Sequence, residues 1–260
     1  MLKKRLIPKL LIETKKIGEE QIAILVTTKG YQKKIAVGDP VSQAKIYEAN
    51  FADELIFTDI SGKNLDENDI FLTLLDKLSQ EIFMPICVGG GVSKLEHFEQ
   101  LLHAGCDKVS INSSLLDDFG FVTNASKNFG AQCVVGSLDF CTVNNNPVIY
   151  NWKLGAPTEI HLNDFCKKLE DSGAGELHLC DVQRDGFGNG LNYKVCSEIS
   201  ETLEIPIIIS GGVGTADDFV EGFQLGGADA VAAGTYFCLR DQSPIQARSH
   251  VKTAGIPIRI

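Results

Sequence analysis

Short apolar runs alternate with longer amphipathic segments along the whole chain. The apolar runs are rich in Val, Ile and Leu, which is typical of parallel strands covered on both faces. They predict strands at 5–12, 54–60, 85–88, 107–111, 132–138, 176–181, 206–210 and 229–233. The intervening segments predict helices near 42–50, 66–80, 94–104, 116–128, 159–172, 191–202, 216–226 and 242–254. Eight strand–helix units predict a single (β/α)8 barrel over residues 1–260, with a doubly wound open sheet as the alternative.

Two segments are longer than an ordinary connection between a strand and a helix. Residues 13–37 follow the first predicted strand, and residues 139–157 follow the fifth. The second segment contains Asn144, Asn145 and Asn146 in succession, which predicts the turn of a hairpin. Connections of this kind lie at the carboxyl ends of barrel strands, where barrel enzymes carry out their chemistry. We therefore expect both segments beside the functional site.

The chain also repeats itself. "PICVGGGV" at 85–92 returns as "PIIISGGV" at 206–213, and "DELIFTDIS" at 53–61 returns as "GELHLCDVQ" at 175–183. "HAGCDKVSINSS" at 103–114 has its counterpart in "LGGADAVAAGTY" at 225–236. The matches keep one order and nearly one offset, so they predict two half-barrels of four units each, approximately 1–128 and 129–260.

The repeated glycines indicate where anions bind. Glycines after a strand allow a tight turn and leave backbone N–H groups free for a phosphate. We expect one such site in each half, and hence a ligand with a phosphate at each end. The first site is predicted at Gly90, Gly91, Asn112 and Ser113, and the second at Asp185, Gly186, Gly211, Gly212, Gly234 and Thr235. Gly89 and Gly214 are open to the simpler interpretation that they only form turns.

Composition narrows the function classes. The net charge of −10 argues against binding to DNA or RNA. The eight cysteines contain no C-x-x-C pair and are typical of buried thiols in a reducing cytosol. No apolar stretch approaches the roughly 18 residues of a membrane span, so we expect a cytoplasmic protein. The five histidines lack metal-binding spacing. We therefore predict neither a metal nor a cofactor.

Several motifs together carry a resemblance to a known family. They are "GDPVSQAKIY", "DELIFTDIS", "PICVGGGV", "AGCDKVSINSS", "RDG" and "PIIISGGVGTADDFVEGFQLGGADAVAAGTYF". Over nearly the whole chain the sequence resembles the HisF-type cyclase subunit of imidazole glycerol phosphate synthase. The resemblance implies a half-barrel duplication and a bis-phosphorylated substrate. It also implies a HisH-type glutaminase partner at the amino-terminal face of the barrel, and ammonia that passes through the barrel to the cyclase site.

One catalytic position departs from that family. The family uses two aspartates as general acid and base; one matches Asp139, whereas the other falls on Leu11, which cannot transfer a proton. Strand alternation places Arg5, Ile7, Lys9 and Leu11 on one face. If that face points inward, Lys9 replaces a small residue inside the barrel. Lys9 could then pair with Asp139, act as a new base, or extend its ammonium group into the barrel mouth.

The opposite end of the barrel keeps the family pattern. The resemblance places the ammonia gate on Arg5, Glu54, Lys108 and Glu176. A retained gate and a lost acid resemble the paralogues of surface-polysaccharide loci, in which ammonia goes to a sugar amidotransferase that builds acetamidino groups. The alternatives are a working cyclase of histidine biosynthesis, with Lys9, Glu13 or a water replacing the acid, and a catalytically silent scaffold that activates the glutaminase. A histidine-pathway isomerase of the same fold is a weaker fourth hypothesis.

Overall fold

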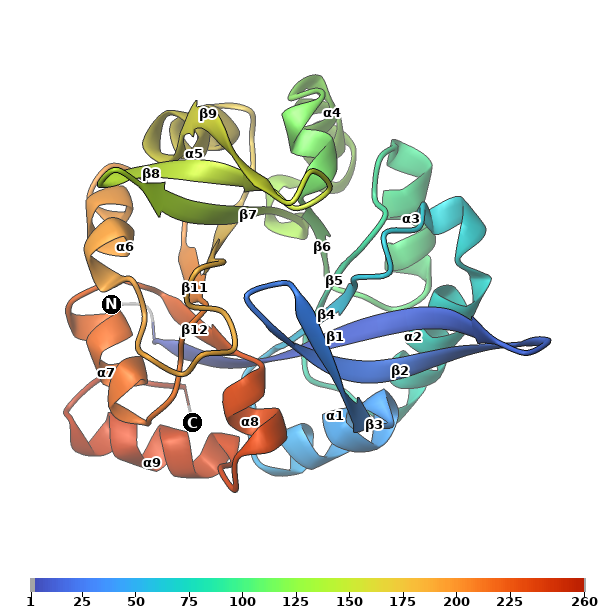
Figure 1. Cartoon of the computed structure of the whole chain (residues 1–260), viewed down its shortest axis with the longest axis horizontal. Coiled ribbons are helices and arrows are strands. Elements are labelled where there is room, and N and C mark those ends of the chain that lie inside the picture. The colour runs from blue at the N-terminus through green and yellow to red at the C-terminus, as the bar shows by residue number, and fades with distance from the viewer. Residues whose placement is uncertain (1–2, 260) are drawn as a thin grey trace.

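The computed structural model describes residues 3–259 and shows a closed barrel of eight parallel strands with helices outside it (Figure 1). Neighbouring strands pair in sequence order, and the pairs β1–β12 and β7–β10 complete the closure. The predicted (β/α)8 barrel is confirmed, and the open sheet is excluded. Of the predicted range, residues 1, 2 and 260 lie outside the described part. The barrel strands are β1 (Arg5–Ile17), β4 (Leu55–Asp59), β5 (Ile86–Gly89), β6 (Lys108–Ile111), β7 (Val134–Val143), β10 (Glu176–Asp181), β11 (Ile207–Ser210) and β12 (Ala230–Ala233).

Helices follow the strands and form the outer layer. All eight predicted helices overlap an observed one, whereas the short α8 was not predicted. The helices are α1 (Pro40–Ala49), α2 (Asp69–Glu81), α3 (Leu95–His103), α4 (Gly120–Phe129), α5 (Leu162–Asp171), α6 (Tyr193–Ser200), α7 (Asp217–Gln224), α8 (Thr235–Leu239) and α9 (Pro244–Thr253). Short 3-10 turns lie at η1 (Leu65–Glu67), η2 (Ser113–Leu116) and η3 (Ala131–Cys133).

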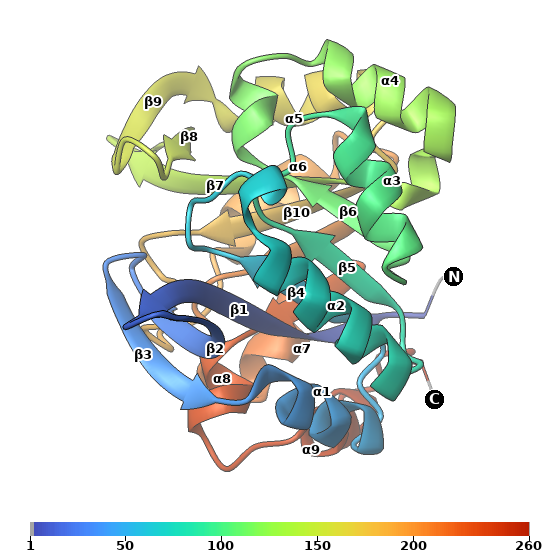
Figure 2. The ribbon, with the colours of Figure 1, turned by 90° about the vertical axis from the view of Figure 1, so that its right-hand side faces the viewer.

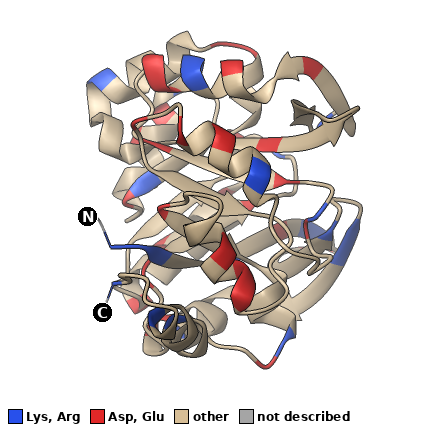
Figure 3. Cartoon of the chain, turned by 90° about the vertical axis from the view of Figure 1, so that its left-hand side faces the viewer, with Lys and Arg blue, Asp and Glu red and all other residues tan. Residues whose placement is uncertain are grey.

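The outer layer carries charges of both signs. Acidic and basic residues are interspersed over the helices and loops on the side shown in Figure 3. None of the helices within residues 3–259 has the length and apolar character needed to cross a bilayer.

Strand alternation divides the apolar residues between two cores. On β1, Leu6 and Leu10 pack into the large core between the strands and the helices. Ile7 points the other way and belongs to a small inner cluster with residues such as Ile56 and Cys87. Because successive strand residues face opposite sides, the same alternation sends Arg5, Lys9 and Leu11 into the barrel interior.

The two long connections are β-sheet extensions. β1 continues to Ile17 and pairs with β2 (Glu20–Lys29), which pairs with β3 (Lys33–Gly38). Residues 13–37, predicted only as a long connection, thus form regular strands; their run of apolar and Thr residues favours this conformation. The other extension joins β7 to β8 (Asn146–Asn151) and β9 (Ala156–His161). Both project from the side of the barrel opposite the chain ends (Figure 2).

The hairpin predicted in the second extension is confirmed. β7 and β8 pair with each other, and Val143 lies opposite Asn146 in their register. Asn144 and Asn145 form the turn with φ of 49° and 64°. Two consecutive left-handed residues give the turn type whose twist matches that of the strands, and Asn tolerates this conformation well.

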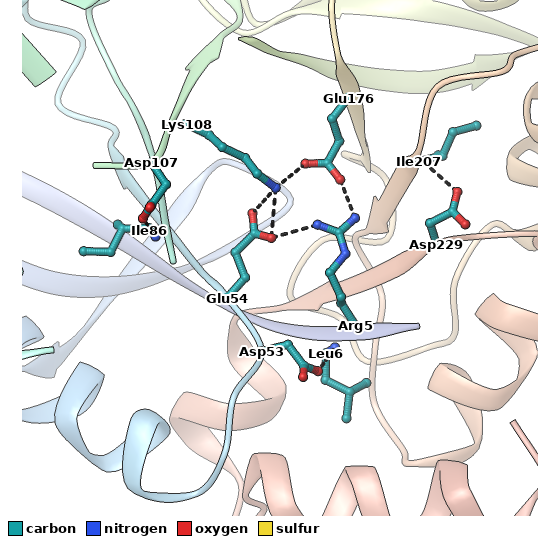
Figure 4. A network of polar contacts seen from close by, with 10 residues as sticks. All are labelled: Arg5, Leu6, Asp53, Glu54, Ile86, Asp107, Lys108, Glu176, Ile207 and Asp229. Atoms are coloured by element: carbon teal, nitrogen blue, oxygen red, sulfur yellow. Dashed lines mark hydrogen bonds and ion pairs between the residues drawn. The ribbon is translucent and has the colours of Figure 1, made fainter. Parts of the chain in front are cut away.

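Aspartates fix the starts of the barrel strands. Asp53, Asp107 and Asp229 each lie before or at the start of one strand and accept a hydrogen bond from the backbone N–H at the start of a neighbouring strand (Figure 4). Their donors are Leu6, Ile86 and Ile207, at 2.8, 2.8 and 3.1 Å. These bonds satisfy N–H groups at the barrel base, where the parallel ladders begin.

Candidate functional site

Four charged side chains meet at the amino-terminal end of the barrel, here called the base. Arg5 donates to Glu54 at 2.7 Å and also to Glu176. Lys108 reaches both oxygens of Glu54, at 2.9 and 3.0 Å, and Glu176 at 2.7 Å. Figure 4 shows the closed circuit, which we call the base ring. The four residues predicted as an ammonia gate are thus brought together. They come from the starts of the neighbouring strands β1 and β4 and of the strands β6 and β10.

The base ring pairs two basic side chains with two acidic ones; Arg5, Glu54 and Glu176 are buried, and Lys108 is half-buried. Burial lowers the pKa of Arg5, but Glu176 and Glu54 outweigh it, and the net shift is upward. Lys108 shows the same balance, with a raised pKa. Both cations therefore keep their protons at neutral pH. Because each cation contacts both carboxylates, no side chain can leave without exposing a buried partner.

An apolar layer lies above the base ring. It consists of the inner cluster Ile7, Ile56, Cys87, Val135, Ile208, Ala230 and Ala232. The Cys87 thiol adjoins the ring: burial first, then the charge of Glu54, raise its pKa well above the usual value. Along β1, the charged layer at Arg5 and the uncharged layer at Ile7 are thus only two residues apart.

A polar layer comes next. It contains Lys9, Ser110, Ser137, His178 and Ser210, all buried. His178 lies between two hydroxyls, with Nδ1 3.1 Å from Ser137 and Nε2 2.8 Å from Ser210. Burial and the charge of Lys9 lower the pKa of His178 to about 3, so its ring is neutral. His178 was missed from the sequence, although strand alternation from Glu176 would have placed it inside.

A cavity of about 680 Å³ opens at the carboxyl-terminal end, here called the mouth. All four residues of the predicted first phosphate site line it: Gly90, Gly91, Asn112 and Ser113. The two glycines have φ of 115° and 68°, which only glycine adopts easily. Their N–H groups have no acceptor among the described residues. The first site therefore offers free donors to a ligand in the cavity.

The six residues predicted for the second phosphate site do not line this cavity. Gly186 packs against β2, where an added Cβ would lie 2.0 Å from the Thr28 carbonyl oxygen. Gly212 has φ of 112°, and neither its N–H nor that of Gly234 has an acceptor among the described residues. Gly211, Thr235 and Asp185 complete the set. The two halves thus match in backbone form, but the described cavity is lined by the glycines of the first half and not by those of the second.

Asp139 stands at the cavity wall with a donor on each carboxylate oxygen. Tyr31 donates to one oxygen at 2.6 Å, and Asn112 donates to the other at 2.9 Å. Burial raises the pKa of Asp139, and the two hydrogen bonds oppose this only in part. Burial and the neighbouring Asp139 also raise the pKa of Tyr31, so its hydroxyl stays protonated. Leu11 lines the same cavity and offers no polar atom.

Tyr31 was not found from the sequence, because it reaches Asp139 across 108 positions of chain. The Gly30-Tyr31 turn between two runs of strand-forming residues was the signal that could have placed it at a hairpin tip. Trp152, whose indole N–H donates to Ser113 at 2.5 Å, was missed in the same way. Both aromatic side chains come from the sheet extensions, which thus build the upper wall of the cavity.

Lys9 points into the barrel but pairs with Asp185 rather than Asp139. Its Nζ lies 3.5 Å from Asp185 Oδ1 and 3.6 Å from Cys180 Sγ. Burial alone would lower the pKa of Lys9, yet Cys180, Asp185 and Asp139 raise it overall. Lys9 is therefore a fixed ammonium ion at neutral pH. A group that holds its proton so firmly is a poor general base.

Comparisons with known proteins agree with this architecture. A family model described as "Histidine biosynthesis protein" matches residues 17–241. A provisionally named imidazole glycerol phosphate synthase subunit hisF2 of Prochlorococcus marinus (strain MIT 9313) is 41% identical over 261 residues, covering 100% of this chain and 99% of that protein. The imidazole glycerol phosphate synthase subunit HisF of Dehalococcoides mccartyi is 35% identical over 223 residues, covering 86% and 88%. The chain therefore belongs to the histidine biosynthesis protein family, as a HisF-like imidazole glycerol phosphate synthase subunit.

Proposed function

We propose that this HisF-like subunit conducts ammonia from a glutaminase partner through the barrel to an acceptor other than the histidine precursor. The observation that carries the proposal is the contrast between the two ends. The base ring is complete, whereas Leu11 occupies the position of the second proton-transfer group. Such a chain keeps a gate and loses the acid–base pair.

The base offers a surface for the glutaminase. Phe83 is 89% exposed and Phe51 is 62% exposed, and both lie in loops that precede barrel strands. Exposed aromatic residues beside a cluster of charged side chains are typical of the anchors of a protein interface. A HisH-type glutaminase seated here would release ammonia next to the base ring.

The acceptor is proposed from chemistry. Asp139 is suited to proton transfer beside the first phosphate site, whereas Lys9 is held as a cation and Leu11 is inert. Ammonia that reaches the mouth would then pass to another protein. We propose a sugar amidotransferase that forms acetamidino groups for lipopolysaccharide or O-antigen synthesis.

The alternative is a functional cyclase of histidine biosynthesis. The cavity, Asp139 and the two matching glycine sets favour it. A catalytically silent scaffold that only activates the glutaminase is the second alternative.

The deciding experiment is turnover of the purified chain with the ribulosyl aminoimidazole ribotide substrate and saturating ammonium salt. Ammonium bypasses the glutaminase, so the assay examines this chain alone. Trp152 is the only tryptophan and lines the cavity, so its fluorescence reports whether the substrate binds. A fluorescence change without turnover supports the proposal. Turnover would instead establish the cyclase.

A second assay addresses the conduit. The chain is mixed with a purified HisH-type glutaminase, and glutamine hydrolysis is measured. Stimulation of hydrolysis supports the partner assignment for both the conduit and the scaffold. The transfer of nitrogen from labelled glutamine to a sugar acceptor is then measured in the presence of the amidotransferase. Transfer supports the conduit, and its absence supports the silent scaffold.

A further inference from the structure

Lys9 lies inside the barrel between the base ring and the cavity wall. Along β1 the inward residues run Arg5, Ile7, Lys9 and Leu11, which belong in turn to the base ring, the apolar layer, the polar layer and the cavity wall. A molecule that moves inside the barrel from base to mouth therefore crosses the layer that holds the Lys9 side chain.

The Lys9 side chain spans the interior instead of following the wall. It starts on β1, and its Nζ ends at Cys180 on β10, although β11 and β12 stand between these strands. Gly234, after β12, lies alongside it: an added Cβ there would lie 3.9 Å from Lys9 Cε, which is van der Waals contact. His178, held by Ser137 and Ser210, fills the neighbouring sector of the same layer.

The Nζ atom of Lys9 is held by Asp185, which in turn contacts residues at the mouth of the barrel. Asp185, its ion-pair partner, also accepts a hydrogen bond from Thr28 of β2 at 2.5 Å. The Asp185 carbonyl accepts from Gly30 N–H at 2.8 Å, next to Tyr31, which contacts Asp139. The position of Lys9 is thus tied to the β2–β3 hairpin that covers the cavity.

We propose that Lys9 is a latch that separates the apolar layer from the cavity and is held shut by Asp185 and Cys180. In this arrangement the interior has two closures, the base ring and the latch. Movement of the β2–β3 hairpin, on which Asp185 depends, would release the second. The identity of the passing molecule as ammonia rests on the proposed function, whereas the latch does not depend on that function.

Cys87 provides a direct test because it lies below the latch, in the apolar layer next to the base ring. The full-length chain is treated with methyl methanethiosulfonate, a small neutral thiol reagent, and modification is followed residue by residue by peptide mass spectrometry. Cys166 on α5 is equally buried but lies in the outer core, so its rate reports general opening of the fold. The measured quantity is the ratio of the Cys87 rate to the Cys166 rate.

Lys9→Ala removes the latch and is expected to raise this ratio at least tenfold. Lys34→Ala removes another cavity-lining lysine, one that pairs with Glu13 at the rim, and should leave the ratio unchanged. Lys9→Ala could unfold the chain by leaving Asp185 unpaired; the double variant Lys9→Ala/Asp185→Asn removes both charges and carries the same expectation. An unchanged ratio in the folded Lys9 variants, or an equal rise in Lys34→Ala, overturns the latch. No glutaminase is present in this test, so failure of the latch and failure of the ammonia proposal are separate results.

Discussion

At the scale of single residues, the mouth of the barrel places the carboxyl group of Asp139 and the side chain of Leu11 at one cavity. Asp139 is hydrogen-bonded on both oxygens, and its raised pKa suits a group that gives and takes protons closer to neutral pH. Leu11 faces the same cavity and has no proton to offer. Our proposal that the chain does not cyclise the histidine precursor thus depends on this one side chain.

The variant Leu11→Asp tests whether that single residue removed a cyclase. A positioned acid or base contributes about 100-fold to 10,000-fold in rate. If the loops at the mouth still hold the substrate, ammonium-dependent cyclase turnover should rise by about 100-fold or more. Leu11→Asn has the same size without proton transfer and is the matched control. Absence of any gain in the aspartate variant would mean that the mouth itself has diverged from cyclase geometry.

The base ring makes a second prediction at this scale. Lys108→Met leaves Glu54 and Glu176 facing each other with Arg5 as the one remaining cation of the ring. Removing one partner of a buried ion network is expected to cost about 3 kcal/mol of unfolding free energy. With the glutaminase and the amidotransferase present, the amount of glutamine hydrolysed should exceed the amount of nitrogen transferred to the sugar acceptor. Denaturant unfolding measures the loss of stability, and the ratio of glutamate formed to aminated sugar measures the loss of coupling.

Lys45→Met is the control for this change. Lys45 forms a surface ion pair with Glu81 at 2.7 Å, and both side chains are exposed. Surface pairs of this kind contribute little to stability. The proposed gate at the base ring would be contradicted if glutamine hydrolysis stays coupled to nitrogen transfer in Lys108→Met. It would also be contradicted if this coupling is lost equally in Lys45→Met.

At the scale of elements, the sequence predicts those strands and helices that have a regular apolar pattern. It does not predict those that depend on contacts between distant segments. The barrel strands were predictable because both faces are buried and each strand reads as an apolar run. The predicted strand at 5–12 missed the extension of β1 to Ile17, since its outer half is exposed and its partner β2 was not expected. Apolar periodicity finds the buried barrel and misses the half-exposed sheet above it.

The site divides in the same way. Positions fixed by strand alternation, such as Arg5, Lys9 and Leu11, could be assigned to the interior from the sequence. The Tyr31–Asp139 and Lys9–Asp185 contacts could not, because each depends on how two distant segments fold over each other. Local pattern carries no information on such pairs.

The turn between β7 and β8 gives a prediction for one element. Asn145 has φ of 64°, a conformation that costs glycine nothing and costs asparagine a little. Asn145→Gly is therefore expected to raise the unfolding free energy slightly, and Asn145→Val to lower it by about 1–2 kcal/mol. Thermal and denaturant unfolding measure both. Asn146→Gly, one residue later and inside β8, should not stabilise; if it does, the turn geometry is not the cause.

At the scale of the whole molecule, the repeat in sequence is matched by a repeat in contacts. Asp59, at the end of β4, accepts from Asn68 at 3.0 Å, and Asp181, at the end of β10, accepts from Asn192 at 2.8 Å. Each asparagine precedes the helix that follows its strand. These paired devices support our hypothesis that residues 1–128 and 129–260 are two copies of one half-barrel.

The two ends of the barrel also differ in what they present to other proteins, and this gives the last prediction. Phe83→Asp places a charge on the proposed glutaminase surface at the base, whereas Leu154→Asp does the same at the mouth. Phe83 is 89% exposed and Leu154 is 76% exposed, so neither change should disturb folding. Phe83→Asp is expected to weaken glutaminase binding at least tenfold, or about 1.4 kcal/mol, and Leu154→Asp to leave it unchanged. Titration calorimetry with the purified partner measures both, and the opposite order of effects would place the glutaminase at the mouth, where ammonia could not enter through the base ring.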